Sequence, residues 1–114
     1  MINNQQSKPL IEVFENSNEV VFIIKGDLEQ GRMSDFSRVM NLELKKKQDR
    51  DLVIDMDRCR FVDSGNLGVI SQAHRDLSSR GRVLRLINVQ KGVAATLACT
   101  SLDKIFDIRL KNGG

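Results

Sequence analysis

The densest group of chemically capable side chains lies in the stretch Leu52–Ile70, which reads LVIDMDRCRFVDSGNLGVI. Asp63 and Ser64 stand side by side there, directly before a segment with helical spacing. An Asp or Ser at a helix start accepts a hydrogen bond from an unpaired backbone N–H, so helix capping is the simplest role for this pair. The free N–H groups and the dipole of a helix start also favour an anion there.

Ser64 would need a base and an oxyanion hole to act as a hydrolytic nucleophile. His74 is the one histidine of the chain, and it lies ten positions further along the predicted helix. That spacing separates the two residues by about 15 Å along a helix axis, at roughly 1.5 Å per residue. The G-x-S-x-G elbow of serine hydrolases is also missing. We therefore expect no enzymatic activity.

Metal-dependent chemistry has equally little support in the sequence. Asp55 and Asp57 end a strand, as the phosphorylated aspartate of a receiver domain does, but Glu15–Ser17 after the first strand offers no paired carboxylates for Mg²⁺. We expect Asp55 to bond to nearby backbone instead. Cys59 and Cys99 are too few and too far apart for a zinc site and are predicted to be free thiols. No metal and no cofactor are expected.

The composition predicts one globular domain. The chain has 114 residues, 40% of them apolar and 29% charged. We expect a domain over residues 10–110, with flexible ends at 1–9 and 111–114. No apolar run approaches the roughly 18 residues of a membrane span, and the start of the chain lacks the apolar stretch of a signal peptide. The expected location is the cytoplasm.

Direct nucleic-acid binding is not expected. The net charge is a modest +3, and the chain has no Trp or Tyr on which bases could stack. Basic residues gather at Lys45–Lys47 and at Arg80, Arg82 and Arg85. Such groups can contact phosphates, but they are more often the solvated ends of helices.

Hydrophobic spacing predicts strands and helices in the order β-β-α-β-α-β-α-β. The strands are predicted over Leu10–Phe14, Val20–Lys25, Leu52–Met56, Val83–Ile87 and Lys104–Leu110, and the helices over Met33–Lys47, Asn66–Ser79 and Gly92–Cys99. Turn residues at Asn16–Glu19 join the first two strands in a hairpin, and Gly81 suits a helix end. This order predicts an α/β fold with a mixed sheet of about four to five strands covered by helices.

Three motifs in register resemble the STAS domain of bacterial anti-sigma factor antagonists. Phe61–Gly68 reads FVDSGNLG, where that family carries F-[MV]-D-S-[ST]-G-L-G at a helix start. Gly26–Glu29 (GDLE) resembles its G-E-L-D, and Thr100–Phe106 (TSLDKIF) resembles its T-G-L-D-x-I-F. The resemblance covers nearly the whole chain and implies a single STAS-like domain.

The resemblance also implies a function and a site. Ser64 matches the serine that is phosphorylated by the partner, an anti-sigma factor with serine-kinase activity. The unphosphorylated antagonist binds this partner, the phosphorylated form releases it, and a phosphoserine phosphatase reverses the modification. The implied partner-binding residues lie after the second strand, in the loop after the third strand and at the helix start: Asp27, Glu29, Arg32, Asp57, Arg58, Arg60, Asp63, Ser64, Gly65, Asn66 and Leu67.

The chain departs from the family pattern close to the acceptor serine. Gly65-Asn66 stands where the family has a small hydroxyl residue and then glycine, and Arg32-Met33 stands where it often has Thr-Ala. These departures leave open a second function. A constitutive STAS scaffold or adaptor in a signalling or lipid-transport complex would use Asp63 and Ser64 as helix caps, without a phosphorylation switch. Such a scaffold would bind its partner equally well after Ser64→Asp.

Overall fold

A computed structural model gives the fold and describes residues 9–46 and 49–113. The strands form one sheet of five in the order β1-β2-β3-β4-β5. Their bounds are β1 (Ile11–Glu15), β2 (Glu19–Ile24), β3 (Asp51–Asp55), β4 (Leu84–Val89) and β5 (Asp107–Leu110). β1 pairs antiparallel with β2, and the other neighbours are parallel. The predicted α/β fold with a mixed sheet is confirmed.

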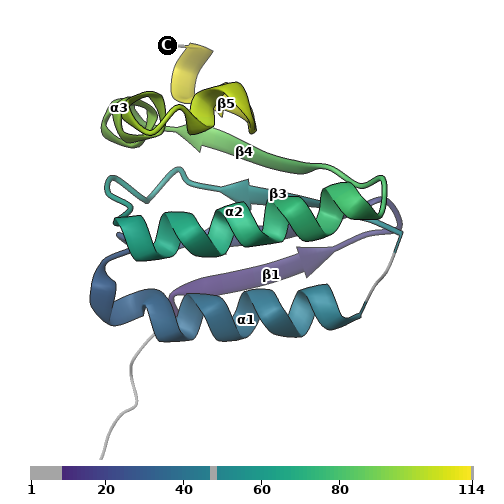
Figure 1. Cartoon of the computed structure of the whole chain (residues 1–114). Helices are drawn as coiled ribbons and strands as arrows, with labels where there is room; N and C mark the ends of the chain where they lie inside the picture. Colours follow the sequence, from purple (N-terminus) through teal and green to yellow (C-terminus); the bar gives the residue numbers. More distant parts are fainter. Residues whose placement is uncertain (1–8, 47–48, 114) are drawn as a thin grey trace, which may run out of the picture.

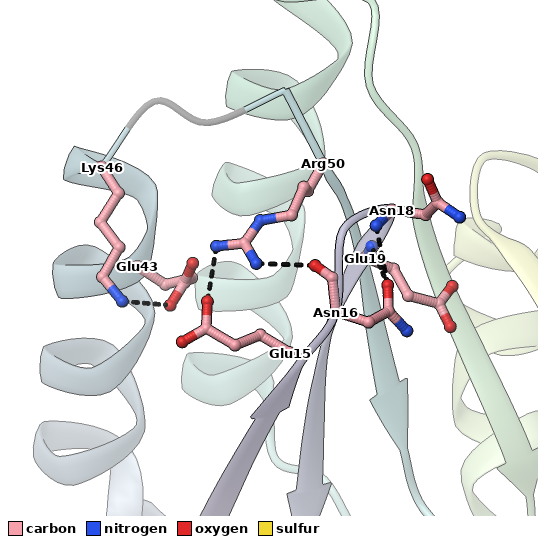
Figure 2. A network of polar contacts seen from close by, with 7 residues as sticks. All are labelled: Glu15, Asn16, Asn18, Glu19, Glu43, Lys46 and Arg50. Carbon is pink, nitrogen blue, oxygen red and sulfur yellow. Dashed lines mark hydrogen bonds and ion pairs between the residues drawn. The ribbon is translucent and has the colours of Figure 1, made fainter.

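The β1–β2 hairpin is held by the side chain that the sequence places in its turn. The Asn16 Oδ1 atom accepts hydrogen bonds from the N–H groups of Asn18 at 2.8 Å and Glu19 at 2.9 Å. Arg50, just before β3, donates to the Asn16 carbonyl at 2.9 Å and forms an ion pair with Glu15 at 2.6 Å (Figure 2). The predicted hairpin is confirmed, and Arg50 ties it to the start of the neighbouring parallel strand.

Three helices contribute the rest of the core. They are α1 (Met33–Lys45), α2 (Ser64–Ser79) and α3 (Lys91–Cys99). Figure 1 shows α1 and α2 side by side in front of the sheet. Their buried side chains join those of the strands in one cluster: Phe36 and Met40 from α1, Leu67, Ile70, Ala73 and Leu77 from α2, and Val93 and Leu97 from α3. The predicted helical faces are thus largely confirmed, although Ala98 is exposed and Lys47 lies outside the described residues.

α2 ends where the glycine signal predicts. Gly81 has a φ of 72°, which an L side chain rarely adopts. Its N–H donates to Ser78 O at 3.0 Å, and the Arg82 N–H donates to Leu77 O at 2.8 Å. This pair of bonds is a Schellman motif, which satisfies carbonyls that the helix end would otherwise leave unpaired.

The last strand is shorter than predicted. Leu102–Lys104 forms a 3₁₀ turn that follows Ser101, whose φ is 62°, and β5 begins only at Asp107. Phe106 is buried between them and packs edge to face against His74 of α2, with ring centroids 5.5 Å apart. The turn is what brings Phe106 into the core. None of the described helices is long and apolar enough to span a bilayer.

The parallel strands bring several loops to one edge of the sheet. β2, β3 and β4 end at this edge, and α2 begins there, at the left in Figure 1. In α/β sheets the carboxyl ends of parallel strands are the usual place for a binding site. All the residues expected at the partner surface follow β2 or β3 and therefore lie toward this edge.

Candidate functional site

Asp63 caps the start of α2. Its backbone is extended, with φ −83° and ψ 174°, and its Oδ1 atom accepts a hydrogen bond from the Asn66 N–H at 2.9 Å. Its carbonyl accepts the Leu67 N–H at 3.0 Å. The capping role predicted for Asp63 is confirmed: its carboxylate satisfies one of the N–H groups that a helix start leaves unpaired, and its carbonyl accepts the first bond of the helix.

Ser64 occupies the first helical position of α2 and is exposed. Within the described part of the chain its hydroxyl makes no hydrogen bond, and neither do the backbone N–H groups of Ser64 and Gly65. The hydroxyl is therefore no structural cap, contrary to the capping interpretation of Ser64. Two backbone donors beside it are available to an anion.

The segment after β2 is bound directly to the loop that precedes α2. The Leu28 N–H donates to Phe61 O at 2.8 Å, and the Asp63 N–H donates back to Leu28 O at 3.0 Å. The Arg60 N–H donates to the Asp27 carboxylate at 2.8 Å. Residues that are more than thirty positions apart in the sequence thus form one continuous surface around Ser64.

Asn66 and Leu67 lie inside this surface rather than on it. Asn66 is fully buried, and its Nδ2 atom donates to Leu28 O at 3.0 Å, Glu29 O at 2.9 Å and Asp63 Oδ1 at 2.8 Å. Leu67 is 5% exposed and belongs to the core. This placement revises the expectation that both residues contact a partner, because their side chains hold the surface together from below.

The loop after β3 is held by β4 and the residues that follow β4 and β5. The Asp55 carboxylate accepts bonds from Asp57 N and Asn88 Nδ2, both at 3.0 Å. The Gln90 side chain donates to Asp57 O, and Lys111 Nζ lies 3.1 Å from the Asp57 carboxylate. Asp55 is thus a strand-end residue bonded to nearby groups, as expected, and its carboxylate has a structural role.

Cys59 is a structural thiol at the centre of the same loop. It is fully buried, and its Sγ atom donates to Phe61 O at 3.3 Å. Burial raises the pKa of the Cys59 thiol, although hydrogen bonds with the backbone of Leu28 and Phe61 oppose the rise. The prediction of two free thiols is confirmed, with Cys99 exposed. A buried, protonated thiol is a poor nucleophile.

Two exposed apolar side chains lie near Ser64. Phe61 is 49% exposed and Met33 is 40% exposed. The neighbouring Val62 is 2% exposed and anchors the loop in the core. Met33 lies over the first turn of α2, since a Cβ atom on Gly65 would come within 2.6 Å of its sulfur. This apolar component was not predicted from the sequence. The signal for it was Phe61, an aromatic residue inside a polar motif.

The arginines around Ser64 differ from those of the second basic group. Arg32, Arg58 and Arg60 are exposed, and no ion pair within the described residues engages their side chains. The arginines of the second basic group are each paired: Arg80 with Asp76, Arg82 with Asp51 and Arg85 with Asp107. These three side chains are paired and partly buried, and Arg85 lies in β4, so the interpretation of the group as a solvated helix end is wrong. The arginines near Ser64 are left as free cations of the site.

The structure separates His74 from Ser64. The two residues are ten positions apart on one straight element, and the His74 ring packs on Phe106. Across residues 9–46 and 49–113, no three His, Cys, Asp or Glu side chains cluster in a way that would hold a metal ion. The arrangement around Ser64 is an exposed surface with an accessible hydroxyl.

Comparison with known proteins agrees with this arrangement. The family model of the STAS domain matches residues 10–113. A solved structure from Thermotoga maritima, provisionally described as an anti-sigma factor antagonist, superposes with a TM-score of 0.80 at 23% identity, covering 87% of this chain and 85% of that one. The anti-sigma factor antagonist SpoIIAA in its unphosphorylated form superposes with a TM-score of 0.68 at 13% identity, covering 88% and 86%. Its phosphorylated form, from Bacillus, gives 0.68 at 14% identity, covering 86% and 89%.

Proposed function

The chain belongs to the STAS domain family, and on this premise we propose that it is an anti-sigma factor antagonist whose partner binding is switched off by phosphorylation of Ser64. The observation that carries the proposal is the state of the Ser64 side chain. It is exposed at the first position of α2, in the place of the acceptor serine of the family motif, and no hydrogen bond within the described residues uses its hydroxyl. A serine that the fold does not need is free to be modified.

The docking surface has an apolar component and a charged rim. Phe61 and Met33 supply exposed apolar area beside Ser64. Arg58, Arg60 and Arg32 surround them with exposed cations. Aromatic residues, methionine and arginine are the types enriched in protein interfaces. Asp27, Glu29 and Asp57 add carboxylates, so the partner is expected to present both signs of charge.

The switch follows from the charge of the modification. A phosphoryl group adds about −1.5 to −2 charges and three acceptor oxygens. The N–H groups of Ser64 and Gly65 can receive it, so the modified chain keeps its fold. A partner that packs on the same helix start meets a bulky dianion beside Asp63. A coupling free energy of about 1–3 kcal/mol already changes an affinity 5- to 150-fold.

The partner in this proposal is an anti-sigma factor with serine-kinase activity, and a phosphoserine phosphatase restores the binding form. The antagonist itself contributes no catalytic group. Residues 10–110 form the binding domain, and the complex forms in the cytoplasm. The family match and the related SpoIIAA structures in both states support this assignment.

A constitutive scaffold or adaptor is the second candidate. Two observations favour it: the Asp63 carboxylate caps α2, and Asn66 fills a position that the family motif gives to glycine. In this alternative the same surface holds a partner permanently.

A capture experiment from native lysate separates the two candidates. Wild type, Ser64→Ala and Ser64→Asp serve as baits. We expect an ATP-binding anti-sigma factor on the first two baits and its loss from the third. Equal retention by all three baits would make the protein a scaffold. Asp103→Asn, in the turn before β5, is the control for a charge change away from Ser64 and is expected to capture like wild type.

A further inference from the structure

Three oxygen atoms converge on the buried amide of Asn66. Its Nδ2 atom lies 3.0 Å from Leu28 O, 2.9 Å from Glu29 O and 2.8 Å from Asp63 Oδ1. An amide nitrogen carries two hydrogens, so three acceptors compete for two donors. The opposite orientation of the amide would place its oxygen against all three acceptors. The three acceptors therefore determine the orientation of the Asn66 amide. Within the described residues the Asn66 Oδ1 atom has no hydrogen-bond partner that would favour the opposite orientation.

The carbonyls of Leu28 and Glu29 each accept a second hydrogen bond. Leu28 O accepts the N–H of Asp63 at 3.0 Å. Glu29 O accepts the N–H of Arg32 at 2.9 Å, which closes the 3₁₀ turn Gln30–Arg32 before α1. The Asn66 amide thus joins the residue beside the acceptor serine to the segment that ends in Arg32.

A phosphoryl group on Ser64 acts on one of the three competing acceptors. Its negative charge repels the neighbouring Asp63 carboxylate, while its oxygens bind the N–H groups of Ser64 and Gly65. A carboxylate that moves away from Nδ2 leaves both amide hydrogens to Leu28 O and Glu29 O. The segment Leu28–Arg32 is then held more tightly than before.

We infer that Asn66 is a positioning residue that transmits the phosphorylation state of Ser64 to the segment Leu28–Arg32. The inference rests on the proposed function and deepens it, because Glu29 and Arg32 belong to the proposed docking surface. One modification then alters both the helix start and the neighbouring segment. Linkage is reciprocal, so a partner bound at Arg32 also changes how favourable phosphorylation of Ser64 is.

The test needs neither the kinase nor the partner. Phosphoserine is installed at position 64 of the full chain by genetic code expansion, in wild type and in Asn66→Ala. Hydrogen exchange at the N–H groups of Leu28 and Arg32 is then followed by NMR. In wild type we expect phosphoserine to slow exchange about 2- to 30-fold, which corresponds to a coupling of about 0.5–2 kcal/mol. In Asn66→Ala the two forms should exchange at equal rates.

Two further variants complete the test. Asn66→Gly introduces the residue of the family motif, and it decides the question should Asn66→Ala fail to fold. Asn16→Ala removes the asparagine acceptor of Asn18 N and Glu19 N in the hairpin, and it should keep the wild-type response. A response to phosphoserine that persists without Asn66 would overturn the inference. Because no partner is present, that result would leave the proposed function intact, and a failed lysate capture would leave this inference intact.

Discussion

Asp63 and Ser64 are neighbours whose side chains differ in their hydrogen bonding. The Asp63 carboxylate satisfies the Asn66 N–H and side chain, whereas the Ser64 hydroxyl is bonded to nothing within the described residues. A modification of the Ser64 hydroxyl therefore replaces no hydrogen bond of the fold. In the proposed function, this hydroxyl controls partner binding.

Asp63→Ala should lower the free energy of unfolding by about 0.5–2 kcal/mol, the usual effect of losing an N-cap. Urea denaturation followed by circular dichroism measures the change. Asp63→Asn keeps a side-chain acceptor and should retain most of the stability. Equal stability of wild type and Asp63→Ala would show that the carboxylate does not cap α2.

The motif around Ser64 could be predicted from the sequence, but the structural role of Asn66 could not. The helix start was recognisable from Asp63-Ser64 and the spacing after it. Two of the acceptors of the Asn66 amide, the carbonyls of Glu29 and Leu28, lie 37 and 38 positions away in the chain, so only the folded molecule brings them together. The exposure of Phe61 likewise depends on which face of the loop meets the core.

Gly68 within α2 and Gly81 just after its end have opposite requirements. Gly81 has a positive φ and ends the helix in a Schellman motif. Gly68 lies within the helix, and a Cβ atom there would meet nothing within 4 Å. The same substitution should therefore have opposite effects at the two positions.

Gly81→Ala should destabilise the fold by about 1 kcal/mol, because it forces an L side chain into the left-handed region. Gly68→Ala should stabilise it by about 0.5–1 kcal/mol, because glycine is unfavourable inside a helix. Thermal and urea unfolding of both variants measure the difference. Shifts of the same sign at both sites would contradict the assigned end of α2.

An ion pair between β4 and β5 makes the free energy of unfolding depend on pH. Arg85 donates to Asp107 at 2.7 Å, and this bond lowers the pKa of the Asp107 carboxyl and raises the pKa of the Arg85 guanidinium. A lowered pKa in the folded state means that the carboxylate stabilises the fold above its unfolded pKa. The contribution is lost as the pH falls through the lowered value.

Asp107→Asn should therefore cost about 0.2–1 kcal/mol at neutral pH, as expected for a partly exposed ion pair. The difference from wild type should fade below about pH 4, near the ordinary pKa of an aspartate. Urea denaturation across this pH range measures it. A difference that grows as the pH falls would contradict the assigned pairing.

The order of the elements followed from hydrophobic spacing because the helices bury one face and the strands are short apolar runs, alternating in β2 and buried throughout the centre of β3. The start of β5 did not follow. Lys104–Leu110 has the pattern of a strand, yet Ser101 takes a left-handed conformation and the following turn carries Phe106 to His74. That contact joins distant parts of the chain, which local spacing does not report.

On the scale of the whole molecule, the proposed docking surface and the hairpin network lie at opposite ends of the strands. The carboxyl edge of the sheet holds Ser64 with Arg58, Arg60 and Phe61 exposed around it. The opposite edge holds the hairpin network of Figure 2, where the Arg50 side chain is 14% exposed and bonded to Glu15 and Asn16. Substitutions at the two ends should affect different properties.

Arg50→Ala should lower the free energy of unfolding by about 1–2 kcal/mol, because it removes a charged hydrogen bond and an ion pair. Capture of the partner should be unchanged at temperatures where the variant is folded. Arg58→Ala should show the reverse: wild-type stability and weaker capture. Unfolding curves and quantitative pull-downs on both variants measure the two properties, and a loss of capture in Arg50→Ala alone would contradict the separation.

The central claim is that phosphorylation of Ser64 releases the partner. Its most direct test is the affinity of the captured anti-sigma factor for the chain with serine, alanine or phosphoserine at position 64, measured by titration calorimetry. We predict equal affinity for serine and alanine, and an affinity about 5- to 150-fold weaker for phosphoserine. Equal affinity for all three forms would contradict the claim and leave a constitutive STAS scaffold.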